Sequence, residues 1–63
     1  MYAEVGDKIR ILYMKGEPQE IGKEGIITYI DDFNQYHGTW SSLAIIPDMD
    51  EFEVIERACD VQS

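Results

Sequence analysis

Apolar residues recur at every second position of this sequence in short runs, and that spacing restricts the structures the chain can form. In the clearest run, Ile9, Ile11 and Tyr13 alternate with Lys8, Arg10 and Leu12. Alternate positions lie on one face of a strand, whereas a helix requires apolar residues three or four positions apart over a longer stretch. The sequence therefore predicts an all-β protein in which Ile9, Ile11 and Tyr13 share the core-facing side of a strand.

Turn-forming residues separate these runs. Gly16 and Pro18 lie in a polar loop through which a helix cannot continue. Asn34 lies in a polar segment where we expect the chain to reverse, because asparagine tolerates a left-handed backbone. Pro47 ends a later apolar run, because proline lacks the N–H group that a strand ladder needs. We predict strands at residues 7–14, 25–31, 36–40, 43–46 and 52–55.

Closely spaced antiparallel strands favour a small barrel, because closing the sheet removes the exposed edges that a flat sheet leaves. The 63 residues suffice for one core. We expect one domain over residues 1–63, with its core at about residues 5–55 and a C-terminal tail that frays after residue 55. Cys59 is the only cysteine, so no disulfide forms within the chain, and packing alone must stabilise the fold.

Acidic residues dominate the charge of the chain. Thirteen Asp and Glu residues stand against five Lys and Arg residues, a formal net charge of −8. Residues 31–63 hold eight of the acids and one base, so most of the charge lies in that half. This excess argues against direct binding of nucleic acid through its phosphates and favours a basic protein partner. The N-terminus lacks the features of a signal peptide, and no segment approaches the ~18 apolar residues of a membrane helix, so we expect a cytoplasmic protein with no membrane partner.

Several short motifs follow one another in a characteristic order. They are VGDKIRI at residues 5–11, GKEGIITYIDD at 22–32, HGTW at 37–40, SSL at 41–43, IP at 46–47 and FEVI at 52–55. In this order they resemble a family of short bacterial and phage proteins of unassigned function that carry an SH3-like barrel. The resemblance covers about residues 5–55 and implies a five-stranded, SH3-like antiparallel barrel in an accessory protein of a phage or other mobile element. It implies no catalytic residue.

The chain departs from the family at two turns. Members usually have an Asp-Asn-Gly type turn after the tryptophan, whereas Trp40 is followed directly by Ser41 and Ser42. A glycine is usual where this chain has Asn34. We expect Ser41 and Ser42 to connect two strands, although a two-residue loop prefers glycine or asparagine.

No pattern in the sequence marks a catalytic centre. His37 has no nucleophile signature around it, and Ser41 and Ser42 lack the flanking glycines of a nucleophile elbow. Gly22 and Gly25 lack the lysine and hydroxyl residues of a phosphate-binding loop, and we interpret them as turn glycines. We therefore interpret the protein as a non-enzyme without a cofactor.

The acidic segment at residues 48–53 also falls short of a metal site. It lacks the central glycine and the distal glutamate of an EF-hand loop, so a solvated acidic turn is favoured over a calcium or magnesium site. A zinc site built from His37 and Cys59 would join residues far apart in the sequence, and nothing marks it. We assign no metal.

Acidic and aromatic residues of the second half form the candidate binding site. If the carboxylates lie on one face, they would bind the Arg and Lys residues with which a partner normally binds the phosphates of nucleic acid. The alternative is that these carboxylates only make the protein soluble. Core packing accounts for most of the aromatic residues, and we expect Trp40 to be the one that is partly exposed. We predict that partner binding involves Asp31, Asp32, Tyr36, Trp40, Asp48, Asp50, Glu51, Glu53 and Glu56.

These observations favour a non-catalytic acidic protein of a phage or mobile element that docks on a basic, nucleic-acid-handling protein. The concrete form of this hypothesis is an inhibitor of a bacterial defence nuclease, of the anti-CRISPR or anti-restriction type. The alternative is an SH3-like peptide-recognition or scaffold module that binds an extended segment in an aromatic groove. We expect a monomer or a small homo-oligomer.

Overall fold

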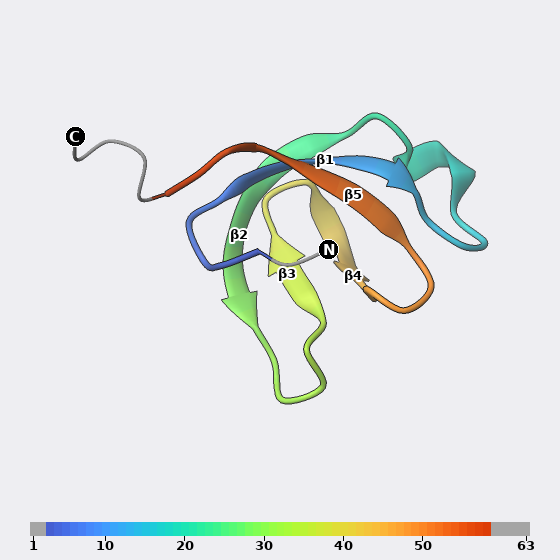
Figure 1. The fold of residues 1–63 in the computed structure, drawn as a ribbon. Coiled ribbons are helices and arrows are strands. Elements are labelled where there is room, and N and C mark those ends of the chain that lie inside the picture. The colour runs from blue at the N-terminus through green and yellow to red at the C-terminus, as the bar shows by residue number, and fades with distance from the viewer. Residues whose placement is uncertain (1–2, 59–63) are drawn as a thin grey trace.

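Five strands and one short helical turn make up the protein in a computed structural model that describes residues 3–58 (Figure 1). Along the chain they are β1 (Lys8–Tyr13), the 3-10 helix η1 (Pro18–Glu20), β2 (Glu24–Ile30), β3 (Tyr36–Gly38), β4 (Ser41–Ile45) and β5 (Glu51–Glu56). The described residues contain no α-helix, and each predicted strand overlaps an observed one. The all-β prediction is confirmed. No helix within residues 3–58 has the length and apolar character needed to cross a membrane.

All five strands belong to one antiparallel sheet with the order β4-β3-β2-β1-β5. β2 takes part in two ladders: its first half pairs with β1, as in Lys8 opposite Ile26, and its second half pairs with β3, as in Ile30 opposite Tyr36. The two halves of the sheet therefore meet along β2, which curves through the molecule in Figure 1.

The sheet does not close. Within residues 3–58 no ladder joins β4 to β5, so the closed barrel that we predicted from the sequence is not formed. Side chains occupy the place of a further strand at the middle of β4: the Leu43 carbonyl accepts a hydrogen bond from the Trp40 indole, and the Leu43 amide donates one to the Ser41 hydroxyl. β4 therefore satisfies these backbone groups without a strand on that side.

The core lies inside the curve of the sheet. Ile9, Ile11 and Phe52 are among its fully buried side chains, and the ring of Tyr36 meets Phe52 edge-on with centroids 5.3 Å apart. This geometry is one of those that aromatic pairs prefer. The buried apolar residues are Ala3, Ile9, Ile11, Met14, Ile27, Tyr36, Trp40, Ile45 and Phe52.

Tyr13 does not belong to this core, contrary to our expectation. The β1–β5 ladder shifts register between Ile11 and Tyr13, so that β1 has one residue more than β5 at this point. Such a bulge breaks the alternation of side chains. Leu12 and Tyr13 are consequently both exposed, and Met14 takes the next buried position.

The turn between β3 and β4 also differs from the prediction. Thr39 and Trp40 form it, whereas Ser41 and Ser42 already belong to β4. The Trp40 ring packs directly on Gly38, because a Cβ atom at that position would lie 2.2 Å from Trp40 Cζ3. Trp40 is therefore only 6% exposed, and the expectation that it would be partly exposed is wrong.

The chain segments that flank the sheet meet at one buried carboxylate. Asp7 Oδ2 accepts a hydrogen bond from the Glu4 amide (2.9 Å), and Asp7 Oδ1 accepts one from the Ala58 amide (2.8 Å). The predicted fraying tail includes residues 59–63, among them Cys59, which lie outside the described residues. The part of that tail up to Ala58 continues β5 to Glu56 and is then held by Asp7.

Candidate functional site

The nine predicted binding residues fall into three separate parts of the structure. Asp31 and Asp32 lie at the β2–β3 turn, Tyr36 and Trp40 lie in the core, and the other acids lie on the β4–β5 turn and on β5. Figure 1 shows the two turns at different corners of the molecule. The predicted carboxylates therefore do not form a single face.

Tyr36 and Trp40 are not available to a partner. Tyr36 is 5% exposed and packs on Phe52, and Trp40 is similarly buried and donates its indole N–H to the Leu43 carbonyl at 2.8 Å. A side chain must be accessible before it can anchor an interface. Among the described residues, the two most exposed aromatic side chains lie instead on the β2–β3 hairpin, where Phe33 is 79% and Tyr29 57% exposed, and Tyr13 on β1 is exposed as well.

Asp31 builds the β2–β3 turn. Its Oδ2 lies 3.0 Å from His37 Nε2, and its Oδ1 accepts hydrogen bonds from the amides of Phe33 and Gln35. The contact with His37, followed by the Gln35 amide, lowers the pKa of Asp31 below its ordinary value. Asn34 adopts φ 62°, which confirms the predicted left-handed residue. Asp31 therefore has a structural task that the sequence does not reveal.

Asp50 joins two loops and is buried, with 7% of the residue exposed. Its Oδ1 accepts a hydrogen bond from the Lys15 amide (3.0 Å), and its Oδ2 accepts one from the Ile46 amide (2.9 Å). The carboxylate thereby links the loop after β1 to the β4–β5 turn. Because buried polar atoms need such partners, Asp50 belongs to the framework of the fold.

The other acids of this region face outward and form what we call the β5 acidic surface, defined by Asp48, Glu51, Glu53 and Glu56. Glu51 and Glu53 alternate with the buried Phe52 and therefore lie on the side of β5 away from the core. Arg10 on β1 lies opposite Glu53 and forms ion pairs with it (3.0 Å) and with Glu24 (2.8 Å).

Most of the charge on the β5 acidic surface remains uncompensated. In the part of the chain that the structure describes, Asp48, Glu51 and Glu56 are exposed and form no ion pair. Lys8, which is paired with Glu56 in the ladder, and Arg10 are the cations on the neighbouring strand β1. The structure thus places four of the predicted binding residues along one strand and its preceding turn, beside two cations of β1.

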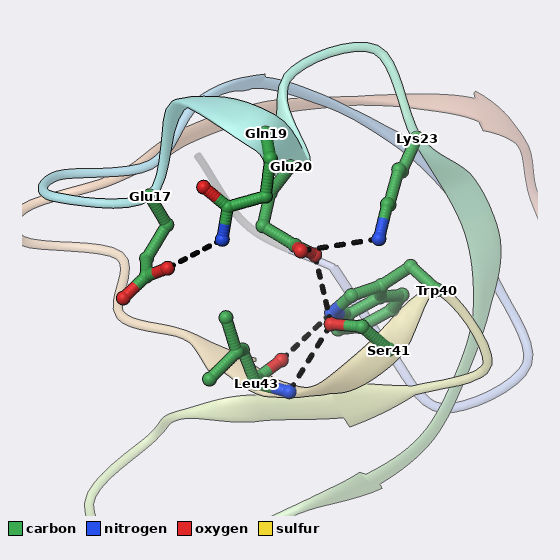
Figure 2. A network of polar contacts seen from close by, with 7 residues as sticks. All are labelled: Glu17, Gln19, Glu20, Lys23, Trp40, Ser41 and Leu43. Carbon is green, nitrogen blue, oxygen red and sulfur yellow. Dashed lines mark hydrogen bonds and ion pairs between the residues drawn. The ribbon is translucent and has the colours of Figure 1, made fainter.

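Sequence reasoning missed the role of Glu20, which is 3% exposed. Its Oε1 accepts a hydrogen bond from the Ser41 hydroxyl (2.8 Å), and its Oε2 accepts one from the Lys23 ammonium group (3.1 Å) (Figure 2). These two contacts, that of Ser41 before that of Lys23, lower the pKa of Glu20. Since Ser41 also accepts the Leu43 amide, Glu20 holds η1 against β4, and nothing in the polar loop around it signals this.

Asp7 was likewise not singled out from the sequence. Burial alone would raise the pKa of its carboxyl, but the hydrogen bonds from the Ala58 and Glu4 amides and the positive charge of Arg57 outweigh burial, and the pKa is lowered. A carboxylate that accepts backbone N–H groups is stabilised in its charged form. Asp7 is therefore a structural anion.

An open groove of about 530 Å³ lies between the loop after β1, strand β4 and the β4–β5 turn. No aromatic residue within residues 3–58 lines it, so this part of the chain does not form the aromatic groove of the alternative hypothesis there. Its lining residues are Met14, Lys15, Glu17, Gln35, Leu43, Ala44, Ile46, Met49 and Asp50. A smaller hollow of about 300 Å³ lies beside it and includes Leu12, Pro47 and Glu51.

Within residues 3–58 no three His, Cys, Asp or Glu side chains are placed to hold a metal ion together. The imidazole of His37 contacts Asp31 and lies against the ring of Tyr29, with centroids 5.4 Å apart. Comparison of the chain with protein-family models, with curated proteins and with solved structures finds no match.

Proposed function

We propose that this protein is a non-catalytic binding module that docks on a basic protein through the β5 acidic surface. One observation carries the proposal: within the described residues, Asp48, Glu51 and Glu56 are exposed along one strand and its preceding turn and form no ion pair, with Lys8 opposite Glu56 as the one cation in the ladder beside them. Three further predicted acids have other surroundings: Asp31 and Asp50 support the fold, and Asp32 lies at the separate β2–β3 turn.

Charge of one sign on one surface acts mainly on encounter and selectivity. It attracts a positively charged cleft over roughly a Debye length, about 10 Å at 0.1 M salt, and it repels nucleic acid. Exposed charge pairs add little affinity by themselves but fix the orientation of the two proteins. A protein that handles nucleic acid carries the Arg and Lys residues that such a surface requires.

The proposal extends to the fold and setting that the sequence suggests. We propose that the five strands, with β2 shared between two ladders, correspond to an SH3-like barrel that stays open between β4 and β5. Membership of the phage and mobile-element family and inhibition of a defence nuclease remain predictions that rest on the sequence motifs and the charge.

A charge-reversal experiment with a matched control tests the proposal. Glu51→Lys with Glu56→Lys changes the β5 acidic surface, and Glu4→Lys with Asp32→Lys changes the net charge equally at exposed sites elsewhere. The probe is a fluorescent oligolysine peptide in low-salt buffer, followed by anisotropy. We expect the first pair to weaken binding by about tenfold and the second by about twofold.

The controls define what would contradict the proposal. Equal weakening by both pairs would mean that only the net charge matters, and binding of a DNA duplex by the wild-type chain would replace a protein partner with nucleic acid. Either result would overturn the proposal.

A further inference from the structure

The geometry points to the 530 Å³ groove as the seat of an extended peptide segment in which an apolar side chain is flanked by Lys or Arg residues. This inference rests on the proposed function and adds what the β5 acidic surface alone does not supply, a place for apolar contact. The groove and that surface adjoin at the β4–β5 turn, where Met49 and Asp50 line the groove between Asp48 and Glu51.

The floor and walls of the groove are apolar. Met14 is 4% exposed and continues the core to the surface, whereas Met49 on the opposite wall is 46% exposed. Leu43, Ala44 and Ile46 complete the apolar lining. Methionine is unbranched and adapts to different partners, so this lining suits apolar side chains of more than one shape.

The walls are held in place before anything binds. Asp50 accepts the Lys15 amide from one wall and the Ile46 amide from the other, so one buried carboxylate sets the distance between them. Strand β4, which supplies Leu43 and Ala44, is fixed in turn by the Glu20–Ser41 contact at 2.8 Å and the Ser41–Leu43 contact at 3.1 Å (Figure 2). A preformed site binds more tightly, because binding does not incur the entropic cost of ordering its loops and side chains.

Charge at the rim selects the occupant. Glu17 and Asp50 line the groove with Lys15, and the exposed Asp48 and Glu51 flank the same turn. Among the described residues, two carboxylates and one ammonium group thus lie in the lining of the groove, and two further exposed carboxylates lie in the adjoining turn. This excess of negative charge favours a cationic segment and disfavours phosphate groups. A second copy of this chain, at net charge −8, would bring like charges together at the same rim.

Binding is tested with three synthetic peptides and the methyl signals of Met14 and Met49. One peptide alternates Lys with Leu, the second Glu with Leu, and the third Lys with Ser. We expect the Lys–Leu peptide to shift both methyl signals and the amides of Leu43 and Ala44 in a saturable way. The Glu–Leu peptide should leave them unchanged, and the Lys–Ser peptide should act only on amides of the β5 acidic surface.

A pair of exposed apolar residues provides the matched variants. Met49→Ser removes one wall of the groove, and Phe33→Ser removes a more exposed apolar residue at the β2–β3 turn, outside the groove. We expect Met49→Ser to lower the affinity for the Lys–Leu peptide by at least about fivefold and Phe33→Ser to leave this affinity unchanged. Because both residues are exposed, both variants should keep the wild-type amide spectrum elsewhere.

Failure of this inference is distinguishable from failure of the proposed function. If Lys–Leu and Lys–Ser peptides bind equally and leave the Met14 and Met49 signals unshifted, the groove is not the site, although a charge-selective β5 acidic surface would stand. If the Lys–Leu peptide fills the groove but Glu51→Lys with Glu56→Lys has no effect on oligolysine, the proposed function is wrong instead. Equal effects of Met49→Ser and Phe33→Ser would overturn the inference as nonspecific apolar binding.

Discussion

Buried carboxylates organise this small protein at the level of single residues. Asp7, Glu20 and Asp50 are each at most 7% exposed, and each accepts hydrogen bonds from two segments of the chain. A buried charged group is costly unless such partners satisfy it. The sequence shows 13 acids but not which of them have these partners, so the charge predicted for a binding surface includes residues that serve the fold.

Asp50 and Asp48 provide a matched test two positions apart. Asp50→Ala should lower the free energy of unfolding by about 2–3 kcal/mol, because it leaves two backbone amides without their acceptor. Asp48→Ala should change it by less than about 0.5 kcal/mol, because Asp48 is exposed. Urea denaturation followed by circular dichroism measures both values, and equal values would contradict the structural role of Asp50.

Strand positions follow from the sequence more directly than the connections between them. Alternation places Ile9 and Ile11 inward, as observed, because a strand has a fixed period. It does not reveal the bulge that exposes Tyr13, since a bulge depends on the pairing with β5. The sequence predicts the β3–β4 turn at Ser41 and Ser42, whereas it lies at Thr39 and Trp40, where the Trp40 ring packs on Gly38. Such a fit depends on contacts that local propensity does not contain.

Gly38 and Gly22 are glycines for different reasons: a side chain at Gly38 would clash with its neighbours, whereas Gly22 has a positive φ angle. Gly38→Ala would place a Cβ atom 2.2 Å from the Trp40 ring and 2.3 Å from the Ile26 carbonyl oxygen, so the turn or β2 must shift. We expect a loss of at least about 3 kcal/mol in the free energy of unfolding. Gly22→Ala meets no atom within 4 Å and incurs only the strain of φ 91°, about 1 kcal/mol.

Thermal and urea unfolding of the two glycine variants distinguish these effects. Given the small stability expected of a chain of this size, Gly38→Ala should populate the unfolded state at room temperature, and Gly22→Ala should remain folded. A Gly38→Ala variant as stable as Gly22→Ala would show that Trp40 can leave Gly38 without cost.

At the scale of the whole molecule, the protein has a net negative charge, and several of its carboxylates stabilise the fold in their charged form. Asp7, Glu20 and Asp31 all have a pKa below the ordinary values of 3.8 for Asp and 4.5 for Glu. Folding therefore favours their charged forms, so their contribution to stability is complete above those values and is lost as the pH falls below them. Stability should accordingly be lost in acid, although the net charge vanishes near pH 4.2.

Unfolding temperatures measured between pH 3 and pH 7 test this expectation. The Tm should decline steeply below about pH 4, and Asp7→Asn should have a shallower decline because one of the three groups no longer titrates. A Tm that is highest at the isoelectric pH would contradict it and would show that repulsion among the carboxylates outweighs their hydrogen bonds.

Added salt should stabilise the folded protein, whereas acid should destabilise it. At pH 7 the exposed carboxylates repel one another, and the few ion pairs, such as those of Arg10, lie at the surface and contribute little. Screening should therefore raise the Tm as sodium chloride increases from about 0.01 M to 0.3 M, where the Debye length falls from about 30 Å to below 8 Å. A falling Tm would mean that surface ion pairs stabilise the fold more than repulsion destabilises it.

The shared carboxylate of Asp7 also determines how the domain could be rearranged. Because Glu4 and Ala58 donate to the same side chain, the first and last described segments lie next to each other. A short Gly-Ser bridge between them, with a new opening at the β2–β3 turn, would give a circular permutant that keeps every strand pair. The same neighbouring ends would let the domain be grafted into a surface loop of a larger protein, where closing the loop costs little entropy.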